Sequence, residues 1–266
     1  MTRVVVVVQA RTGSTRLPGK VMLPAAGAPL LAHQLARVQA ASTPSEIVVA
    51  TTVAAADAPI RALCRALGVR EISGHPTDLL DRHVQAARAT AADVIVKIPS
   101  DCPLIDPAAI DRVTGGFLEE PGAYDYVSNL HPATWPDGND VEVMPADVLE
   151  LAWVEAQRPL EREHTTPFLW DRPARFRIGN VRWETGRDLS QSHRFTLDYA
   201  EDYAFIRAVT EALWTPARPI FSLAEILALL DAQPALRALN AMHVGTSWMS
   251  QHAGELATLT SEVRHD

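Results

Sequence analysis

Three cations and two glycines are clustered near the start of the chain. The segment "QARTGSTRLPGK", residues 9–20, contains Arg11, Arg16 and Lys20. It directly follows five consecutive valines, residues 4–8, and such a β-branched run is typical of a strand buried on both faces of a parallel sheet. Backbone amides at a strand-to-helix turn form a concave anion site, and glycine lets a phosphate approach closely. We therefore expect this loop to bind phosphate groups.

The loop differs from the two common phosphate-binding patterns. Five residues separate Gly13 from Gly19, where a Walker A loop has four, and Val21 stands where the magnesium-binding Ser or Thr would be. The chain also contains no G-x-G-x-x-G dinucleotide fingerprint. The alternative interpretation is a solvated basic loop that binds no ligand.

Two aspartates in separate motifs have the chemistry to hold a metal ion. Asp101 lies in "KIPSDCPLIDP" after an expected strand over 93–98, and Asp198 ends "HRFTLD", 193–198, which we predict to be another strand of the main sheet. Parallel strands bring their carboxyl ends to one sheet edge, where α/β proteins bind ligands. Because Mg²⁺ takes one or two carboxylates plus phosphate oxygens, the pattern indicates a phosphate-and-metal site. Alone, Asp101 could equally cap the following turn.

Polar side chains beside a tryptophan indicate where a second substrate binds. "WPDGNDVEV" and "EREHTT" supply the candidate acceptor contacts Asp137, Asn139, Asp140, Glu142, Glu163 and His164. Carboxylate and amide groups next to the aromatic ring of Trp135 suit a polyhydroxylated molecule. The alternatives are an acidic turn between two strands and a solvated helix face.

Alternating strands and helices must position these groups. We expect strands at 4–8, 46–51, 69–72 and 93–98 and helices at 29–41, 57–68 and 77–90, which predicts a doubly wound, mostly parallel, Rossmann-like α/β sheet. Residues 124–190 predict a mixed α+β, partly antiparallel insertion. Helices follow at 199–213 and from 222 onward. The predicted division is a domain over 1–214 and a C-terminal helical extension over 215–266, its last ten or so residues loosely packed.

Composition restricts the partners of the chain. The net charge of −8 over 266 residues gives no electrostatic support for binding nucleic acid or an anionic membrane, so any polyanion must be met locally. Cys64 and Cys102 have neither metal-ligand spacing nor a disulfide framework, and Cys102 has no neighbouring base that would make it a nucleophile. The valine run is too short for a signal peptide and no stretch approaches about 20 apolar residues. We expect a cytoplasmic protein.

A family resemblance combines these motifs. The ordered set "QARTGSTRLPGK", "DLLDRHVQAA", "SDCPLIDP", "YDYVSN", "PDGNDVEV", "EREHTTPFL" and "RFTLDYAEDY" resembles the spore coat polysaccharide biosynthesis protein F family. That family lies within the cytidylyltransferases related to acylneuraminate and ketodeoxyoctonate cytidylyltransferases. The resemblance covers about residues 3–210. It implies a nucleotidyltransferase fold, transfer of CMP from CTP to a sugar or sugar-like acid with release of pyrophosphate, a requirement for Mg²⁺, and a homodimer formed through the insertion.

The resemblance also implies residue roles. Arg11 and Lys20 match the triphosphate-binding cations, with Arg16 in the same loop, and Asp101 and Asp198 match the paired magnesium aspartates; these imply the catalytic set Arg11, Lys20, Asp101 and Asp198. The remaining nucleotide-binding positions are Gln9, Ala10, Gly13, Ser14, Thr51 and Arg82. Ser100 is a departure, because relatives commonly have glycine before the aspartate.

Two other functions remain open from the sequence. A glycosyltransferase that consumes nucleotide-sugars usually carries a metal-binding D-x-D, whereas "SDCP" offers a single aspartate. A non-catalytic nucleotide-binding partner in a polysaccharide pathway would also carry a phosphate loop. The sequence identifies neither the acceptor nor the nucleotide base.

Overall fold

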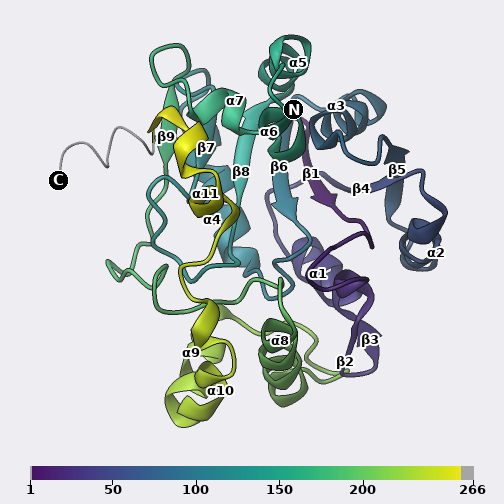
Figure 1. Cartoon of the computed structure of the whole chain (residues 1–266), viewed down its shortest axis with the longest axis vertical. Helices are drawn as coiled ribbons and strands as arrows, with labels where there is room; N and C mark the ends of the chain where they lie inside the picture. The colour runs from purple at the N-terminus through teal and green to yellow at the C-terminus, as the bar shows by residue number, and fades with distance from the viewer. Residues whose placement is uncertain (1, 259–266) are drawn as a thin grey trace.

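A seven-stranded sheet runs through the computed structural model, which describes residues 2–258 (Figure 1). The strand order is β5 (Arg70–Gly74), β4 (Glu46–Thr52), β1 (Val4–Gln9), β6 (Val94–Pro99), β8 (Glu142–Pro145), β7 (Tyr126–Ser128) and β9 (Ile178–Asn180). The first four are parallel, β8 is antiparallel to both of its neighbours, and β7 pairs in parallel with β9. The predicted α/β class is confirmed, and 124–190 supplies the mixed strands.

Helices cover both faces of this sheet. One face packs on α1 (Leu30–Gln39), α2 (Ala58–Leu67) and α4 (Pro107–Leu118), and the other on α3 (Leu79–Thr90), α5 (Ala146–Glu155), α6 (Pro159–His164) and α7 (Pro167–Trp170). The valines of β1 divide between the two faces: Val4, Val6 and Val8 join one cluster, and Val5 and Val7 the other. All five are buried, as expected for a central parallel strand.

A third apolar cluster lies beyond the carboxyl ends of the strands. It includes α8 (Ala200–Leu213), α9 (Leu223–Ala232) and the hairpin of β2 (Pro24–Ala25) and β3 (Ala28–Pro29), with α10 (Pro234–Ala238) beside them. The basic loop therefore reaches α1 through a 3₁₀ turn, η1 (Lys20–Met22), and this hairpin. In Figure 1 the yellow C-terminal segment returns from α10 toward the sheet through η3 (Ala241–His243), α11 (Trp248–Gln251) and η4 (Ala253–Glu255).

The prediction of a strand over 193–198 is wrong. This segment is extended, but it forms only a single bridge, between Asp137 and Arg194. Its backbone bonds go to loops instead, because Phe195 N donates to Asp137 O and Leu197 N donates to Asp101 O. Of the last ten residues, predicted to be loose, 259–266 lie outside the described residues.

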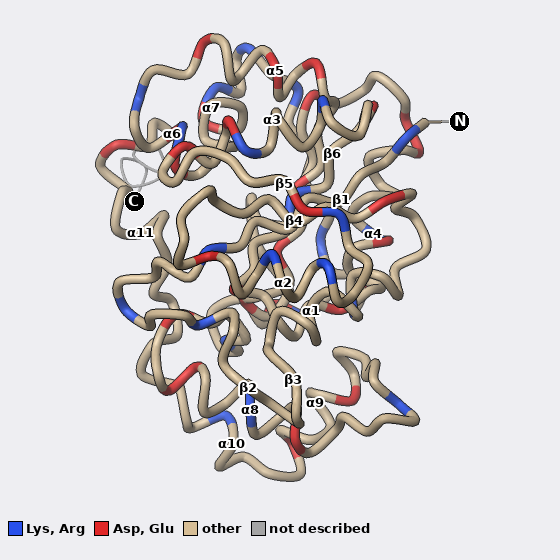
Figure 2. The backbone as a smooth tube through the Cα atoms, turned by 90° about the vertical axis from the view of Figure 1, so that its right-hand side faces the viewer, with Lys and Arg blue, Asp and Glu red and all other residues tan. Residues whose placement is uncertain are grey.

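Charge is distributed over the whole chain, not gathered in one segment. Figure 2 shows acidic and basic positions interspersed along the backbone. Within residues 2–258, no helix is both long and apolar enough to cross a membrane.

Candidate active site

A cavity of about 540 Å³ lies at the carboxyl ends of β1 and β6. It gathers nearly all of the predicted site residues, namely Gln9, Ala10, Arg11, Gly13, Ser14, Arg16, Lys20, Arg82, Asp101, Asp137, Asn139, Asp140, Glu142, Glu163, His164 and Asp198. Thr51 is the exception. Its side chain is fully buried within β4 and does not line the cavity.

Asp57 and Gly19 set the shape of the basic loop. The Asp57 carboxylate accepts from both the backbone N and the Oγ1 of Thr12, each at 2.7 Å. Gly19 N donates to Thr12 O at 2.9 Å, and Gly19 has a φ of 69°, a left-handed conformation that glycine adopts without steric cost. The loop therefore folds back on itself and delivers Lys20 to the sheet edge.

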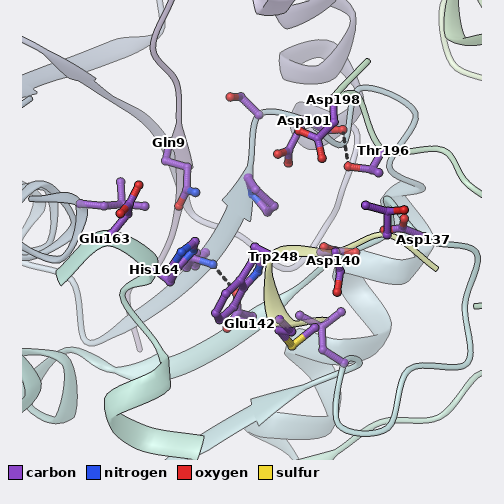
Figure 3. Close-up of a pocket in the computed structure, with 18 of the residues that line it drawn as sticks. Gln9, Asp101, Asp137, Asp140, Glu142, Glu163, His164, Thr196, Asp198 and Trp248 are labelled. Atoms are coloured by element: carbon purple, nitrogen blue, oxygen red, sulfur yellow. Dashed lines mark hydrogen bonds and ion pairs between the residues drawn. The ribbon is translucent and has the colours of Figure 1, made fainter. Parts of the chain in front are cut away.

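Lys20 lies between the two predicted metal aspartates. Its Nζ is 2.9 Å from Asp198 Oδ1 and 3.4 Å from Asp101 Oδ2, and it donates to Leu197 O at 2.6 Å. Burial alone would lower the pKa of Lys20, but the two carboxylates raise it above its usual value. Arg16 Nη2 is also 2.9 Å from Asp198 Oδ1. The labelled Asp101 and Asp198 lie side by side in Figure 3.

The backbone explains why these two aspartates meet. Leu197 N donates to Asp101 O at 2.8 Å, and Thr196 Oγ1 donates to the same carbonyl at 3.3 Å. The segment before Asp198 is thus attached to the turn after β6. Asp198 then stands just before the amino terminus of α8, where the helix dipole favours a negative charge.

Arg194, which we did not single out from the sequence, organises the far side of the same cluster. Its side chain, 1% exposed, bonds both oxygens of Asp202 and also contacts Asp137 at 3.2 Å and Asp198 at 3.5 Å. Burial would lower the pKa of Arg194, but Asp202 and the other carboxylates raise it. The sequence feature that could have identified Arg194 is its position in "HRFTLD", four residues before Asp198.

A second group of cations lies toward α3. Arg11 Nη1 and Arg82 Nη1 both donate to Pro76 O, at 3.3 and 3.1 Å, and Arg11 lies 4.0 Å from Glu163. Gln9 lines the cavity at the end of β1, and its buried Oε1 has no hydrogen-bond partner in the described structure. We call the part of the cavity lined by 9–20, 77–82 and 99–101 the nucleotide end.

The opposite part, which we call the acceptor end, is lined by residues from 129–142, 164–170 and 245–252. Asp137 and Asp140 face it, and Figure 3 shows them across from Asp101 and Asp198. The pKa values of Asp137 and Asp140 are raised by burial and by neighbouring carboxylates, so each binds its proton more tightly than an exposed aspartate.

Two of the predicted acceptor contacts are engaged with the protein itself. The Asn139 side chain accepts from Asp106 N and donates to Pro136 O, which fixes the loop before β8. The buried Glu142 pairs with Lys97 and accepts from Tyr126 Oη at 2.6 Å. Both side chains therefore hold the cavity wall in place through bonds to other protein groups.

Aromatic rings form the rest of the acceptor end, and of these the sequence singled out His164 but not Trp248, His131 or Trp170. The imidazole of His164 stacks on the indole of Trp248, with ring centroids 3.9 Å apart and planes 8° from parallel. The ring centroids of His131 and Trp170 are 4.4 Å apart. Burial and the nearby Lys97 lower the pKa of His164 to about 4, so its ring is neutral at pH 7.

The donor set suits magnesium. In residues 2–258, no group of three or more His, Cys, Asp and Glu side chains is arranged to hold a metal ion. Asp101 and Asp198 nonetheless converge on one cation, the ammonium of Lys20, which shows that their oxygens can share a positive partner. Two carboxylates completed by phosphate oxygens are a typical Mg²⁺ environment.

A family model described as cytidylyltransferase matches residues 5–229. The chain belongs to the cytidylyltransferase family. An uncharacterized protein of Methanocaldococcus jannaschii is 32% identical to this cytidylyltransferase over 244 residues, 90% of this chain and 94% of the relative. The spore coat polysaccharide biosynthesis protein SpsF of Bacillus subtilis is 30% identical over 239 residues, 88% and 96% of the two chains. The resemblance found in the motifs is confirmed.

Solved structures agree with this assignment. The structure of a cytidylyltransferase from Leptospira borgpetersenii superposes with a TM-score of 0.84 at 28% identity, covering 93% of this chain and 99% of that one. The structure of CMP:2-keto-3-deoxy-manno-octonic acid synthetase complexed with CTP gives a TM-score of 0.59 at 19% identity, covering 79% and 99%. At that identity the second match shows the shared fold alone.

Proposed function

We propose that this cytidylyltransferase transfers CMP from CTP to a sugar, sugar acid or related small acceptor and releases pyrophosphate, with Mg²⁺ as its cofactor. The observation that carries the proposal is the convergence of Lys20, from the basic loop, with Asp101 and Asp198 in one cavity. A cation to meet the triphosphate and two carboxylates to meet its metal are the charges that this reaction needs.

The reaction requires positioning and charge neutralisation more than covalent help from the protein. An acceptor oxygen forms a bond to the α-phosphorus of CTP, and the bond from that phosphorus to the pyrophosphate breaks. Arg11, Arg16 and Lys20 would hold the departing phosphates. Cys102 is fully buried and burial raises its thiol pKa, so it offers no nucleophile.

Asp101 and Asp198 would hold the magnesium ion, which when bound neutralises phosphate charge and orients the attacking oxygen. Lys20 and Arg16 contact Asp198 and keep it ionised: burial would raise the pKa of Asp198, but Lys20 and Arg16 lower it below the usual value. The Asp198 carboxylate is therefore charged near neutral pH, as a magnesium ligand must be.

The base would lie near Gln9, Ala10 and Arg82. A buried Gln9 Oε1 without a partner in the described structure supports this placement, because a base amino group would satisfy it. The acceptor would lie against residues of 124–190, with Asp137, Asp140 and His164 at the cavity surface. Homodimer formation through this segment, and its role as an acceptor-binding unit, belong to the same proposal.

The test is pyrophosphate release from CTP with Mg²⁺ and a panel of keto-sugar acids, aldoses, amino sugars and small phosphorylated or phosphonate acceptors. Release with one class of acceptor is expected. If no acceptor releases pyrophosphate, the proposal is wrong. Hydrolysis of a nucleotide-sugar without CTP turnover would point to a glycosyltransferase, and tight CTP binding without any turnover would point to a non-catalytic partner.

A further inference from the structure

The acceptor end is closed by a stretch of chain that lies beyond the family match. We call residues 240–258 the C-terminal strap. The matched residues end at 229, yet Gly245 to Met249, Gln251 and His252 all line the cavity. Figure 3 shows Trp248, on the yellow ribbon of the strap, beside His164, on which it stacks.

At its amino end, the strap is attached to the cluster that Arg194 forms with Asp198 and Asp202. The Asn240 side chain, 2% exposed, donates to Arg194 O and to Asp202 Oδ1, both at 2.9 Å. Arg194 Nη1 in turn donates to Thr246 O at 2.8 Å. The same arginine that contacts Asp198 therefore holds the start of the strap.

The strap is attached at its other end to the helices behind the sheet. Leu256 is fully buried in the cluster formed with α3, α5, α6 and α7. Arg158 Nη1 donates to Glu255 O at 3.0 Å, and Thr258 N and Oγ1 both donate to Asp171. Because both ends are fixed, the segment between them, which carries Trp248, holds a defined position at the cavity.

The charges at the acceptor end determine how a ligand can be recognised there. Among the described residues around this end, Lys97 is paired with Glu142, and Arg194 is paired with Asp202 and Asp137. Arg11, whose charge contributes together with burial to the lowered pKa of His164, lies 4.0 Å from Glu163. Asp137 and Asp140 add carboxylates, so an anionic group would meet no unpaired lysine or arginine in this part of the described wall. Recognition must then rest on ring packing and on hydrogen bonds to the carboxylates, which are the contacts a hydroxylated ring makes.

We propose that the C-terminal strap completes the acceptor site and that Trp248 is its specificity-determining residue, against which a hydroxylated sugar ring packs. This inference rests on the proposed function, and it names the class of acceptor and the residue that selects it. Half-buried Trp248 already has its indole fixed by the His164 stack, so the platform is formed before the acceptor arrives and little ordering entropy is lost on binding.

The test compares Trp248→Ala, Trp248→Leu and Trp248→Phe with the wild type over the same acceptor panel. Met242→Ala is the matched control, since Met242 lies in the strap, is 68% exposed and does not line the cavity. We expect Trp248→Ala and Trp248→Leu to raise the acceptor KM at least tenfold while the KM for CTP stays within twofold. Trp248→Phe should stay within threefold of the wild type, and Met242→Ala should match it. The leucine variant keeps apolar bulk against the strap core, should the alanine variant fail to fold.

A binding measurement separates this inference from the proposed function. With CTP and Ca²⁺ in place of Mg²⁺ to prevent turnover, each acceptor is titrated while tryptophan fluorescence is recorded. A sugar should quench the wild type and leave Trp248→Phe largely unquenched. Quenching without pyrophosphate release in Mg²⁺ would overturn the proposed function and support the inference. If no sugar in the panel binds, if an acyclic acceptor is used equally well by Trp248→Ala, or if CTP and acceptor affinities fall together, the inference is wrong.

Discussion

Lys20 Nζ lies 2.9 Å from Asp198 Oδ1, although the two residues are 178 positions apart in the chain. The contact joins the basic loop after β1 to the segment before α8. Asp101, from the turn after β6, lies 3.4 Å from the same ammonium, so Lys20 contacts both aspartates. The central charges of the site are thus assembled by the fold alone.

Loss of the Lys20 charge should impair catalysis more than folding. Lys20→Met should lower kcat/KM for CTP by about 10²–10³, the usual effect of removing one donor to developing charge. Lys20→Arg should retain part of the activity because the charge remains. Steady-state kinetics tests this, with thermal unfolding as the control for folding. A Lys20→Met enzyme within threefold of wild type would show that the ammonium does not contact the triphosphate.

The two aspartates should govern the magnesium requirement. Asp101→Asn and Asp198→Asn should each raise the Mg²⁺ concentration for half-maximal activity by about tenfold or more, because an amide is a neutral ligand. Asp231→Asn, an exposed change on α9, is the control. Magnesium titrations of the three variants decide the matter. Unchanged magnesium dependence in both site variants would place the metal elsewhere.

Gly138 should be needed because the loop that contains it lies close to the backbone of residues 193–198. It has a φ of 99°, and a Cβ there would lie 2.6 Å from Phe195 C. Gly138→Ala should therefore lower the free energy of unfolding by more than Gly186→Ala. Gly186 also has a positive φ, of 71°, but its Cβ would meet no atom within 4 Å, so only about 1–2 kcal/mol of backbone strain is expected. Denaturant unfolding measures both, and equal losses would contradict the steric argument.

Buried His83 should make the fold sensitive to acid. Burial lowers its pKa to about 3 from an ordinary value near 6.5. Between these values the unfolded chain binds the proton and the folded chain does not, so stability falls as pH drops from 6.5 toward 3, by up to about 1.4 kcal/mol per pH unit. His83→Leu should flatten this dependence, because leucine has no titratable group. The variant loses the Nδ1 contact with Leu79 O but no bond of Nε2, which has no hydrogen-bond partner in the described structure. Urea unfolding at pH 7 and pH 5 tests it; an unchanged difference between the two pH values would refute it.

The regular elements could be predicted because local signals agreed with the fold. The valine run gave β1, Gly68 closed α2 in a left-handed conformation, and Asp78 capped α3 by accepting from Asp81 N. The strand prediction for 193–198 was wrong, although the alternating pattern of this segment fits a strand. Its backbone groups instead bond to the loops that carry Asp101 and Asp137, and such pairing depends on tertiary packing that the pattern does not encode.

The candidate site was predictable where charge and spacing carried the information. Two of the three loop cations, Arg16 and Lys20, contact the predicted aspartates, whereas Thr51 is fully buried in β4 and does not line the cavity. Trp248 could not be found from its own motif, because its place at the cavity depends on how the strap returns to the sheet. The pairing of Glu142 with Lys97 likewise comes from the register of β6 and β8, which places the two residues opposite each other.

The most direct test of CMP transfer follows the label of [α-³²P]CTP in the presence of Mg²⁺ and the acceptor panel. The predicted result is label in a CMP–acceptor product, one pyrophosphate released per product formed, and a lower yield of both with Asp198→Asn at a Mg²⁺ concentration that is half-saturating for the wild type. Label that remains in CTP with every acceptor, or that appears only as free CMP, would contradict the account.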